Sequence, residues 1–192
     1  MLRNSVSRRN LILISLGLLV LAAMAVVLVP KGAQADAGVP FKGTFTAAAS
    51  ANLNTGNVTY CGGAPLGLAV EAHGAGHSSL GALSLSLQKT IDVPGPMHGC
   101  LILTAPNGDT LNATYDGTEG GPNNNNFNAG SGTLTFTGGT GRFRDARGSA
   151  QFAAVFSSTY PASSFIGGTD APLQVMAFYS VEGAVSLQNG DQ

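Results

Sequence analysis

Apolar and polar residues alternate with a period of two along much of the chain beyond residue 36, and this pattern limits the fold most strongly. Leucines alternate with serines over residues 83–87, and Leu134 and Phe136 alternate with threonines. The same period runs through residues 150–156 and 175–187. Successive side chains of a strand point to opposite faces, so these segments are predicted to be strands with one face in a core.

Shorter runs predict further strands, separated by clusters of glycine, proline and asparagine that are typical of turns. The candidate strands are residues 41–48, 57–61, 66–72, 100–104 and 110–116. Two stretches are predicted to be long loops, residues 119–132 with four consecutive asparagines and residues 161–172.

Eight or nine strands with no helix between them favour an antiparallel sandwich or barrel. Only 10% of the residues are charged, which leaves few charges to protect edge strands, and closing the sheet removes those edges. We therefore expect an all-β fold, a single antiparallel barrel of eight strands give or take one, preceded by an N-terminal hydrophobic signal helix.

The N-terminus has the three parts of an export signal. Arg3, Arg8 and Arg9 precede an uninterrupted apolar run over residues 11–29. Ala33-Gln34-Ala35 follows, a small-x-small site of the kind that signal peptidase cuts. Cleavage between Ala35 and Asp36 would separate a signal peptide, residues 1–35, from a barrel domain, residues 36–192.

Two features of this segment leave alternatives open. The apolar run is close to the ~20 residues that span a bilayer, so an uncleaved membrane anchor is the alternative to cleavage. The adjacent Arg8 and Arg9 resemble the twin-arginine export motif, although a strongly apolar run favours the general export route. In each case the barrel is expected to be exported, either secreted or held outside the cytoplasm by residues 11–29.

The charge and the cysteines of the exported part limit its partners. Residues 36–192 hold five basic and ten acidic residues, a net charge of −5, which argues against a nucleic-acid partner. Cys61 and Cys100 both lie in this part, and an oxidising compartment favours a disulfide between them. Two buried thiols, or one catalytic thiol, are the alternatives.

The sequence carries no persuasive metal or catalytic motif. His73 and His77 lie four residues apart in a glycine-rich segment with no acidic or cysteine cluster beside them, so they are interpreted as loop histidines. The segment from Gly76 to Gly81 has Leu80 where a nucleophile elbow needs glycine. We therefore expect no metal and no cofactor, and the catalytic residues, if any exist, are unknown.

One motif does resemble a known family. The stretch GGTGRFRDARG over residues 138–148 is very similar to the signature of plant dirigent proteins, whose barrel is related to that of allene oxide cyclases. It also resembles a group of exported bacterial proteins of unknown function that carry GGTGRF, in which a segment ending in ANGDTL precedes the motif. This chain has that segment with an inserted proline over residues 105–111, and Val39-Pro40-Phe41-Lys42-Gly43-Thr44 is similar too.

The resemblance implies an eight-stranded antiparallel barrel with a central cavity, often oligomeric in the plant relatives, so a homo-oligomer is a possible assembly. The motif residues suit a tight turn that closes the barrel end, with glycines that permit positive φ and apolar plugging side chains. The structural motif comprises Gly138, Gly139, Thr140, Gly141, Phe143, Ala146 and Gly148.

Four charged residues are candidates for binding a ligand at the barrel cavity: Arg144, Arg147, Glu71 and Glu182. A guanidinium at the cavity mouth can hold a carboxylate or a quinone-like oxygen. The alternative is a structural turn whose arginines are solvated or paired with Asp145.

Three functions follow from this interpretation. The first is a non-catalytic exported barrel that binds a small apolar ligand. The second is a dirigent-type or cyclase-type protein that steers a reactive intermediate, and the third is a structural surface protein with a filled barrel. An open, mixed apolar and polar cavity is expected for the first two and a solidly packed core for the third.

Overall fold

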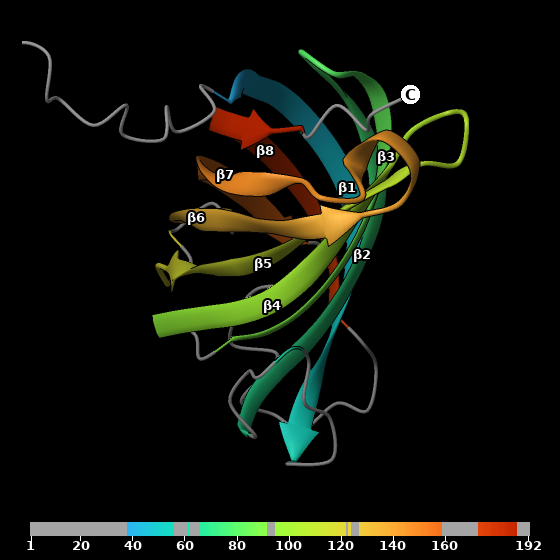
Figure 1. Cartoon of the computed structure of the whole chain (residues 1–192). Coiled ribbons are helices and arrows are strands. Elements are labelled where there is room, and N and C mark those ends of the chain that lie inside the picture. The colour runs from blue at the N-terminus through green and yellow to red at the C-terminus, as the bar shows by residue number, and fades with distance from the viewer. Residues whose placement is uncertain are drawn as a thin grey trace, which may run out of the picture. The chain divides into compact units, whose positions relative to one another are not determined.

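The structure, a computed structural model, describes residues 38–55, 61, 66–91, 95–121, 123, 127–158 and 173–187. Its elements are β1 (Val39–Thr55), β2 (Leu66–Ser78), β3 (Gly81–Ile91), β4 (Gly95–Thr104), β5 (Thr110–Glu119), β6 (Phe127–Gly139), the 3₁₀-helix η1 (Gly141–Phe143), β7 (Arg147–Ser158) and β8 (Leu173–Ser186). Each strand pairs antiparallel with the next, and β8 pairs with β1, so the sheet closes into a barrel (Figure 1).

The predicted all-β fold, a closed antiparallel barrel of eight strands, is confirmed. The signal segment 1–35 and its hydrophobic helix lie outside the described residues and stay predictions. Among the described residues no helix is long and apolar enough to cross a membrane.

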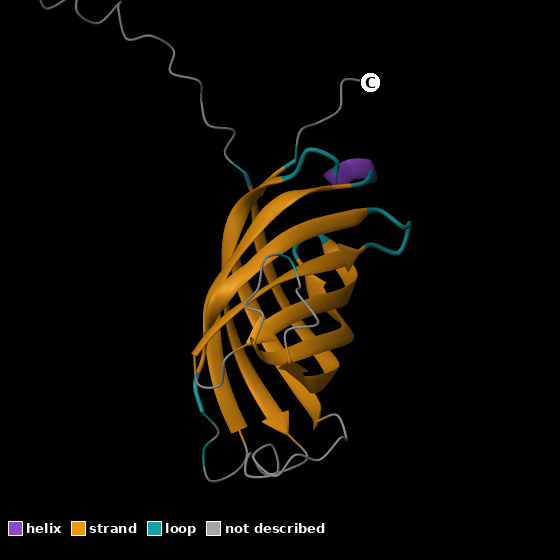
Figure 2. Ribbon diagram, turned by 90° about the horizontal axis from the view of Figure 1, so that it is seen from below, coloured by secondary structure: helices purple, strands orange, loops and turns teal. Residues whose placement is uncertain are grey.

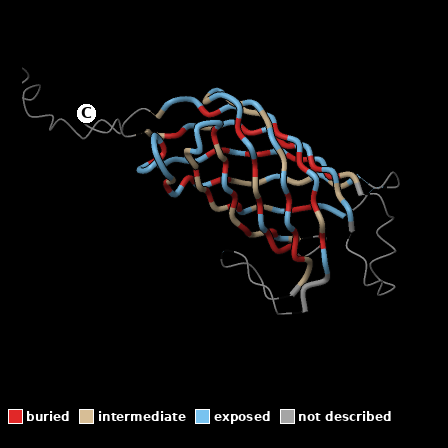
Figure 3. Tube along the Cα trace, turned by 90° about the vertical axis from the view of Figure 1, so that its right-hand side faces the viewer, coloured by how far each residue is buried: buried red, intermediate tan, exposed pale blue. Residues whose placement is uncertain are grey.

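The alternation in the sequence becomes the two faces of the barrel wall. Buried and exposed residues follow one another along the strands (Figure 3). In β3, Leu83, Leu85 and Leu87 are buried while Ser84 and Gln88 are exposed. A period of two puts every second side chain in the interior, so the apolar residues of all eight strands meet in one core.

The segment 119–132 differs from the sequence prediction of a long loop. β5 continues to Glu119 and β6 starts at Phe127, so half of the predicted loop is strand. Glycines obscure the alternation here, because Gly130 and Gly132 take the inward positions of β6. An added Cβ would lie 2.9 Å from the Phe156 ring at Gly130 and 2.8 Å from the Phe152 ring at Gly132. The missing side chains leave room for these rings.

Two further strand predictions have different outcomes. The candidate strand 57–61 lies outside the described residues except for Cys61, which is in a turn. The glycine-rich segment with the two histidines is not a loop, since β2 extends to Ser78 and carries His73 and His77 on its outer face. Gly74 and Gly76 face inward against β1, where a Cβ would meet the Ala47 backbone and the Phe45 ring.

The connections between the strands lie at the two ends of the barrel. At one end three connections are fully described: residues 79–80, 105–109 and 140–146, the last with η1 (Figure 2). At the other end lie the β1–β2, β3–β4, β5–β6 and β7–β8 connections. Phe143 and Ala146 are completely buried at the first end, where they close the interior.

Candidate functional site

A large hollow formed by described residues lies on the outside of the barrel wall. It has a volume of about 910 Å³ and crosses five neighbouring strands, in the order β3, β2, β1, β8 and β7, and it is also lined by the end of β4. We call this hollow the outer groove. It is lined by residues 44–46, 75–77, 82–84, 104–106, 153–155 and 178–180.

The outer groove is mainly apolar and uncharged. Phe178 is 49% exposed and Val155 is 45% exposed, and the two residues face each other across the β7–β8 pair. On the other side of Phe178 lies Thr46 of β1. None of the described lining residues is Asp, Glu, Lys or Arg, and His77 is the one titratable side chain among those that are exposed. Large exposed apolar side chains gathered in a hollow are typical of a binding surface.

The interior of the barrel is filled by contrast. Aromatic rings occupy its middle, with Tyr115 stacked on Phe152 at 4.3 Å between ring centres and Phe156 edge-on to Tyr179 at 5.9 Å. The hollow recorded within these walls has a volume of about 10 Å³, roughly the space of one water molecule. The central cavity expected from the family resemblance is therefore not open in the part of the barrel that the structure describes.

An ion pair lies inside this apolar core. The Lys89 Nζ atom lies 3.1 Å from Oε2 of Glu119, and the side chains are 3% and 8% exposed. Asn128 donates a hydrogen bond of 3.1 Å to the other carboxylate oxygen. Nζ also lies 3.7 Å from Sδ of Met97 and 4.3 Å from the centre of the Phe156 ring. Lys89 is thus held by one charge and otherwise by soft, polarisable groups.

Burial shifts the pKa values of Lys89, Tyr115 and Tyr179. Desolvation lowers the pKa of Lys89, and the charge and hydrogen bond of Glu119 partly oppose that effect. Burial also raises the pKa of Tyr115 well above its usual range, with smaller contributions from Tyr179 and Glu119. The pKa of Tyr179 rises for the same first reason. The Tyr115 hydroxyl has no hydrogen-bond partner among the described residues.

The turn that contains the GGTGRF motif is hydrogen-bonded to two neighbouring turns. The Asp109 carboxylate accepts hydrogen bonds from Asn107 Nδ2 and from the backbone N–H of Arg142. These bonds, the Asn107 contact first, hold the Asp109 pKa below its usual value. Gly141 lies against that carboxylate with a φ of +53°, where a Cβ would collide with it. Arg142 donates to the Leu80 carbonyl, which connects the β2–β3 turn to the same assembly.

The other motif residues lie in the same turn. The Thr140 hydroxyl accepts a hydrogen bond from the Thr110 backbone N–H, and the Thr140 N–H donates to the Thr110 carbonyl. Gly139 lies so close to that carbonyl that a Cβ would overlap it. Gly138 and Gly148 have φ of +124° and +134°. Each motif position therefore has a structural reason, and none of these contacts needs a ligand.

The structure places the four charged ligand-binding candidates on the outside of the barrel. Glu71 and Glu182 are exposed on the outer faces of β2 and β8. Glu182 pairs there with Lys42 at 2.6 Å, the two side chains being 70% and 64% exposed. Arg144 and Arg147 are exposed in and after the motif turn.

None of the four lies with the Lys89–Glu119 pair, and none lines the outer groove. Arg147 Nη1 donates to the Ala146 carbonyl, and within the described residues no ion pair joins Asp145 to either arginine. The four side chains therefore do not point into the barrel. A ligand-binding role for them stays a prediction.

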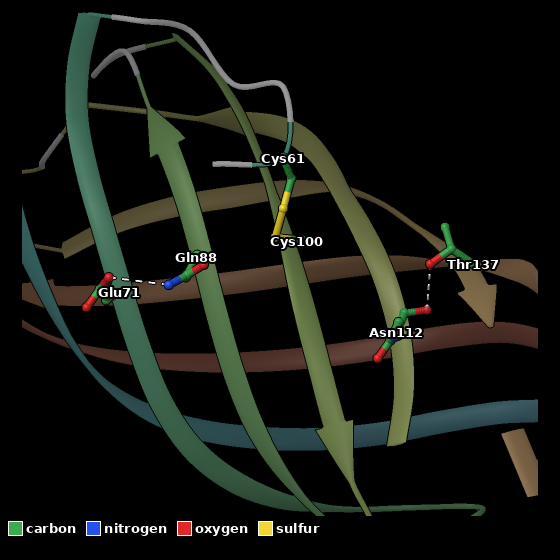
Figure 4. The surroundings of a disulfide bond; sticks show 6 residues. All are labelled: Cys61, Glu71, Gln88, Cys100, Asn112 and Thr137. Atoms are coloured by element: carbon green, nitrogen blue, oxygen red, sulfur yellow. Dashed lines mark hydrogen bonds between the residues drawn. A yellow bond between two sulfur atoms is a disulfide. The ribbon is translucent and has the colours of Figure 1, made fainter. Parts of the chain in front are cut away.

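The predicted disulfide is confirmed. Cys61 and Cys100 are bonded with their Cα atoms 5.7 Å apart, and they lie 39 residues apart in the sequence. Figure 4 shows this bond on the outer side of β4, near the hydrogen-bonded Glu71 and Gln88. Closing a loop of this length stabilises the fold by about 3–4 kcal/mol in the chain-entropy account. Both cysteines are used, so neither is a free thiol.

The contacts of His98 and Ser79 have structural roles. Within the described residues no group of three or more His, Cys, Asp or Glu side chains could hold a metal ion. His98 pairs with Asp116 at 2.6 Å on the exposed surface. The Ser79 hydroxyl donates to the Pro40 carbonyl and accepts from the Lys42 N–H, which fixes the β2–β3 turn to β1.

The sequence interpretation missed the Lys89–Glu119 pair, although the alternation contains a signal for it. Leu83, Leu85 and Leu87 point inward, so Lys89 at the next odd position of β3 does too. Glu119 follows the same odd-numbered series in β5. The outer groove had no such signal, because it depends on how five strands curve together.

Fold and site together define a class: a closed antiparallel β-barrel with a filled centre, a buried ion pair and an apolar groove on its outside. No protein-family model matches the chain. No curated protein matches it either.

Among solved structures the chain is similar to a pterocarpan synthase dirigent protein. The identity is 15% and the TM-score 0.39, over 79% of this chain and 87% of the other. The resemblance to exported bacterial GGTGRF proteins is not tested by these findings and stays a prediction.

Proposed function

We propose that this protein is an exported, non-catalytic barrel that binds a small apolar molecule in the outer groove. The observation that carries this proposal is the groove itself, about 910 Å³ in volume, with exposed Phe178 and Val155 in its wall. Pockets for small molecules commonly measure about 300–1,000 Å³ and are mainly apolar. Export and the disulfide are consistent with each other, since disulfides persist in oxidising compartments.

The lining favours a neutral ligand. The described groove residues include no Asp, Glu, Lys or Arg, so a charged group placed there would lose hydration without gaining an ion pair. The hydroxyls of Thr44, Thr46, Ser84 and Ser180, which are exposed, can orient one or two polar atoms of a ligand. A hollow surface also suits a smaller, convex molecule better than an identical hollow surface on a second copy.

Binding of the apolar fluorophore N-phenyl-1-naphthylamine tests this function. We expect a saturable rise in fluorescence with the intact protein. Phe178→Ala should weaken binding by about tenfold, because loss of roughly half the apolar area of a phenyl ring corresponds to about 1–2 kcal/mol.

The matched control is Phe127→Ala. Phe127 is a similarly exposed phenylalanine, 42%, that lies outside the groove lining. Its removal should leave the affinity unchanged. Absence of saturable binding, or an equal loss in both variants, would reject the groove as the site.

A structural surface protein with a filled barrel is the second candidate. The packed interior, with its hollow of about 10 Å³, favours this alternative over a protein that encloses a ligand. The same interior leaves the dirigent-type or cyclase-type alternative without a chamber for a reactive intermediate in the described part of the barrel. Failure of the fluorophore experiment would support the structural role.

A further inference from the structure

His77 is an exposed polar side chain in the wall of the outer groove. It lies on the outer face of β2, near one end of that strand. Within the described residues its imidazole makes no hydrogen bond and no ion pair, whereas His98 is paired with Asp116. An unpartnered polar side chain in a mainly apolar hollow is a candidate contact for a polar group of a ligand.

The side chains beside the imidazole are small. Thr44 of β1 and Ala82 of β3 lie directly opposite His77 on its two sides. Ala75 is the previous outward residue of β2, and all three of these neighbours line the groove. The imidazole is longer than any of them, so it extends above them into the groove. A neutral imidazole accepts a hydrogen bond at one ring nitrogen.

The apolar part of the groove lies well away from this acceptor. Phe178 lies opposite Thr46, and Thr46 lies two residues from Thr44, the partner of His77. Two strand spacings of about 4.8 Å across the sheet and about 6.6 Å along it place the backbones of Phe178 and His77 roughly 12 Å apart. A ligand that contacts both side chains must therefore be elongated.

We propose that His77 determines the specificity of the outer groove, by accepting a hydrogen bond from a hydroxyl group of an elongated, uncharged ligand whose apolar part packs on Phe178. This inference rests on the proposed function and adds the class of ligand, an alcohol with a long apolar chain or ring system. A wholly apolar ligand would cover the imidazole and displace its water without replacing the lost hydrogen bonds, which costs free energy.

The surroundings favour a hydroxyl group over a charged one. The described lining has no Asp, Glu, Lys or Arg that could pair with a charge on the ligand. Lys42, the next outward residue of β1 beyond Thr44, is already paired with Glu182 at 2.6 Å. A carboxylate or an ammonium group in the groove would lose hydration and gain no ion pair from an uncharged imidazole.

Competition against N-phenyl-1-naphthylamine tests the inference with two ligands that differ in one group. The competitors are 6-phenylhexan-1-ol and its methyl ether, which has no O–H donor, measured at pH 8, where free imidazole is neutral. We expect His77→Leu to weaken binding of the alcohol by about fivefold, equivalent to one neutral hydrogen bond of about 1 kcal/mol. Binding of the ether should change by less than about twofold, because it donates no hydrogen bond.

His73→Leu is the matched control. His73 is exposed on the same face of β2, four residues from His77, and lies outside the groove lining. Its replacement should leave the affinity for both competitors unchanged. Phe178→Ala should weaken the alcohol and the ether alike, because both carry the phenyl ring. Both histidines are exposed, so the leucine variants should fold as the wild type does, which circular dichroism checks.

An equal loss of alcohol and ether in His77→Leu, or no loss of either, would overturn the inference. An effect of His73→Leu as large as that of His77→Leu would also overturn it. The proposed function stands in each of these cases, provided that N-phenyl-1-naphthylamine binds saturably and that Phe178→Ala weakens its binding. Absence of saturable binding rejects the groove as a site, so the two failures are distinguishable.

Discussion

Lys89 and Glu119 stabilise each other in a core that would otherwise reject both charges. Removing one partner of such a pair leaves an uncompensated buried charge, which typically costs about 3–5 kcal/mol. Glu119 also accepts the Asn128 hydrogen bond, so its carboxylate has two partners, the buried Lys89 and the half-buried Asn128. The effect of mutation should therefore depend on whether one residue or both are changed.

We expect Glu119→Gln to lower the free energy of unfolding by about 3–5 kcal/mol and the double change Lys89→Met with Glu119→Leu to recover most of it. Urea denaturation of each purified variant measures both values. The exposed pair of Lys42 and Glu182 is the control: the corresponding double change there should alter stability by less than about 1 kcal/mol. Similar effects of Glu119→Gln and Glu182→Gln would contradict this view of the core.

At the scale of elements, strands could be predicted from the sequence wherever large apolar side chains occupy the inward positions. β3 shows this directly, with leucines at three successive inward positions. The same periodicity, extended by two residues, places Lys89 inside, although lysine is rarely buried. Composition and periodicity disagree at such a position, and only the packing of neighbouring strands decides between them.

The start of β6 shows why other parts could not be predicted. Residues 127–132 contain glycine, serine and asparagine, which usually indicate a loop. In the barrel they form a strand segment that pairs with β7 along its whole length and with β5 from Gly130 onward. The apolar volume that this strand lacks comes from Phe152 and Phe156 of β7, whose rings lie over its glycines. The apolar residues that account for the packing of this strand therefore lie in another strand, β7.

The turn between β6 and β7 yields a prediction about Gly141. Its φ of +53° disfavours any residue with a Cβ, and a Cβ there would collide with the Asp109 carboxylate. We expect Gly141→Ala to lower the free energy of unfolding by about 1–3 kcal/mol, through backbone strain and displacement of Asp109. Thermal unfolding followed by circular dichroism measures the change.

Gly121→Ala is the matched control, because a Cβ at Gly121 would meet nothing within 4 Å. This substitution should have little effect on stability. If Gly141→Ala were equally mild, the contact with Asp109 would not be what fixes the turn.

At the scale of the whole molecule, the closed barrel separates four regions: one closed end, a packed middle, a buried ion pair and a groove on the outside. The GGTGRF turn and its neighbours close one end with hydrogen bonds and the buried Phe143. The aromatic middle is packed. The buried Lys89–Glu119 pair lies toward the other end, and the outer groove lies on the outside of the wall. Within the described residues the middle of the interior is packed, which favours a ligand site on the outside of the wall.

The stability of the whole barrel should fall at alkaline pH because of its buried tyrosines. Burial raises the pKa of Tyr115 and Tyr179 in the folded state. The folded protein therefore keeps these phenol protons above about pH 10, where the unfolded chain releases them. Their contribution to stability is complete below about pH 10 and is lost as the pH rises toward the folded-state values. Lys89, with its lowered pKa, acts in the opposite direction at pH below about 10.5.

Phenolate absorbance and circular dichroism, recorded together during an alkaline titration, measure this coupling. The chain has four tyrosines, and we expect part of the absorbance change to coincide with loss of the β-sheet signal rather than to occur near pH 10. The double variant Tyr115→Phe with Tyr179→Phe should lose that delayed part and unfold at higher pH, since it has no buried phenol to ionise. Ionisation of all four tyrosines near pH 10 in a barrel that stays folded would show that Tyr115 and Tyr179 are accessible to water.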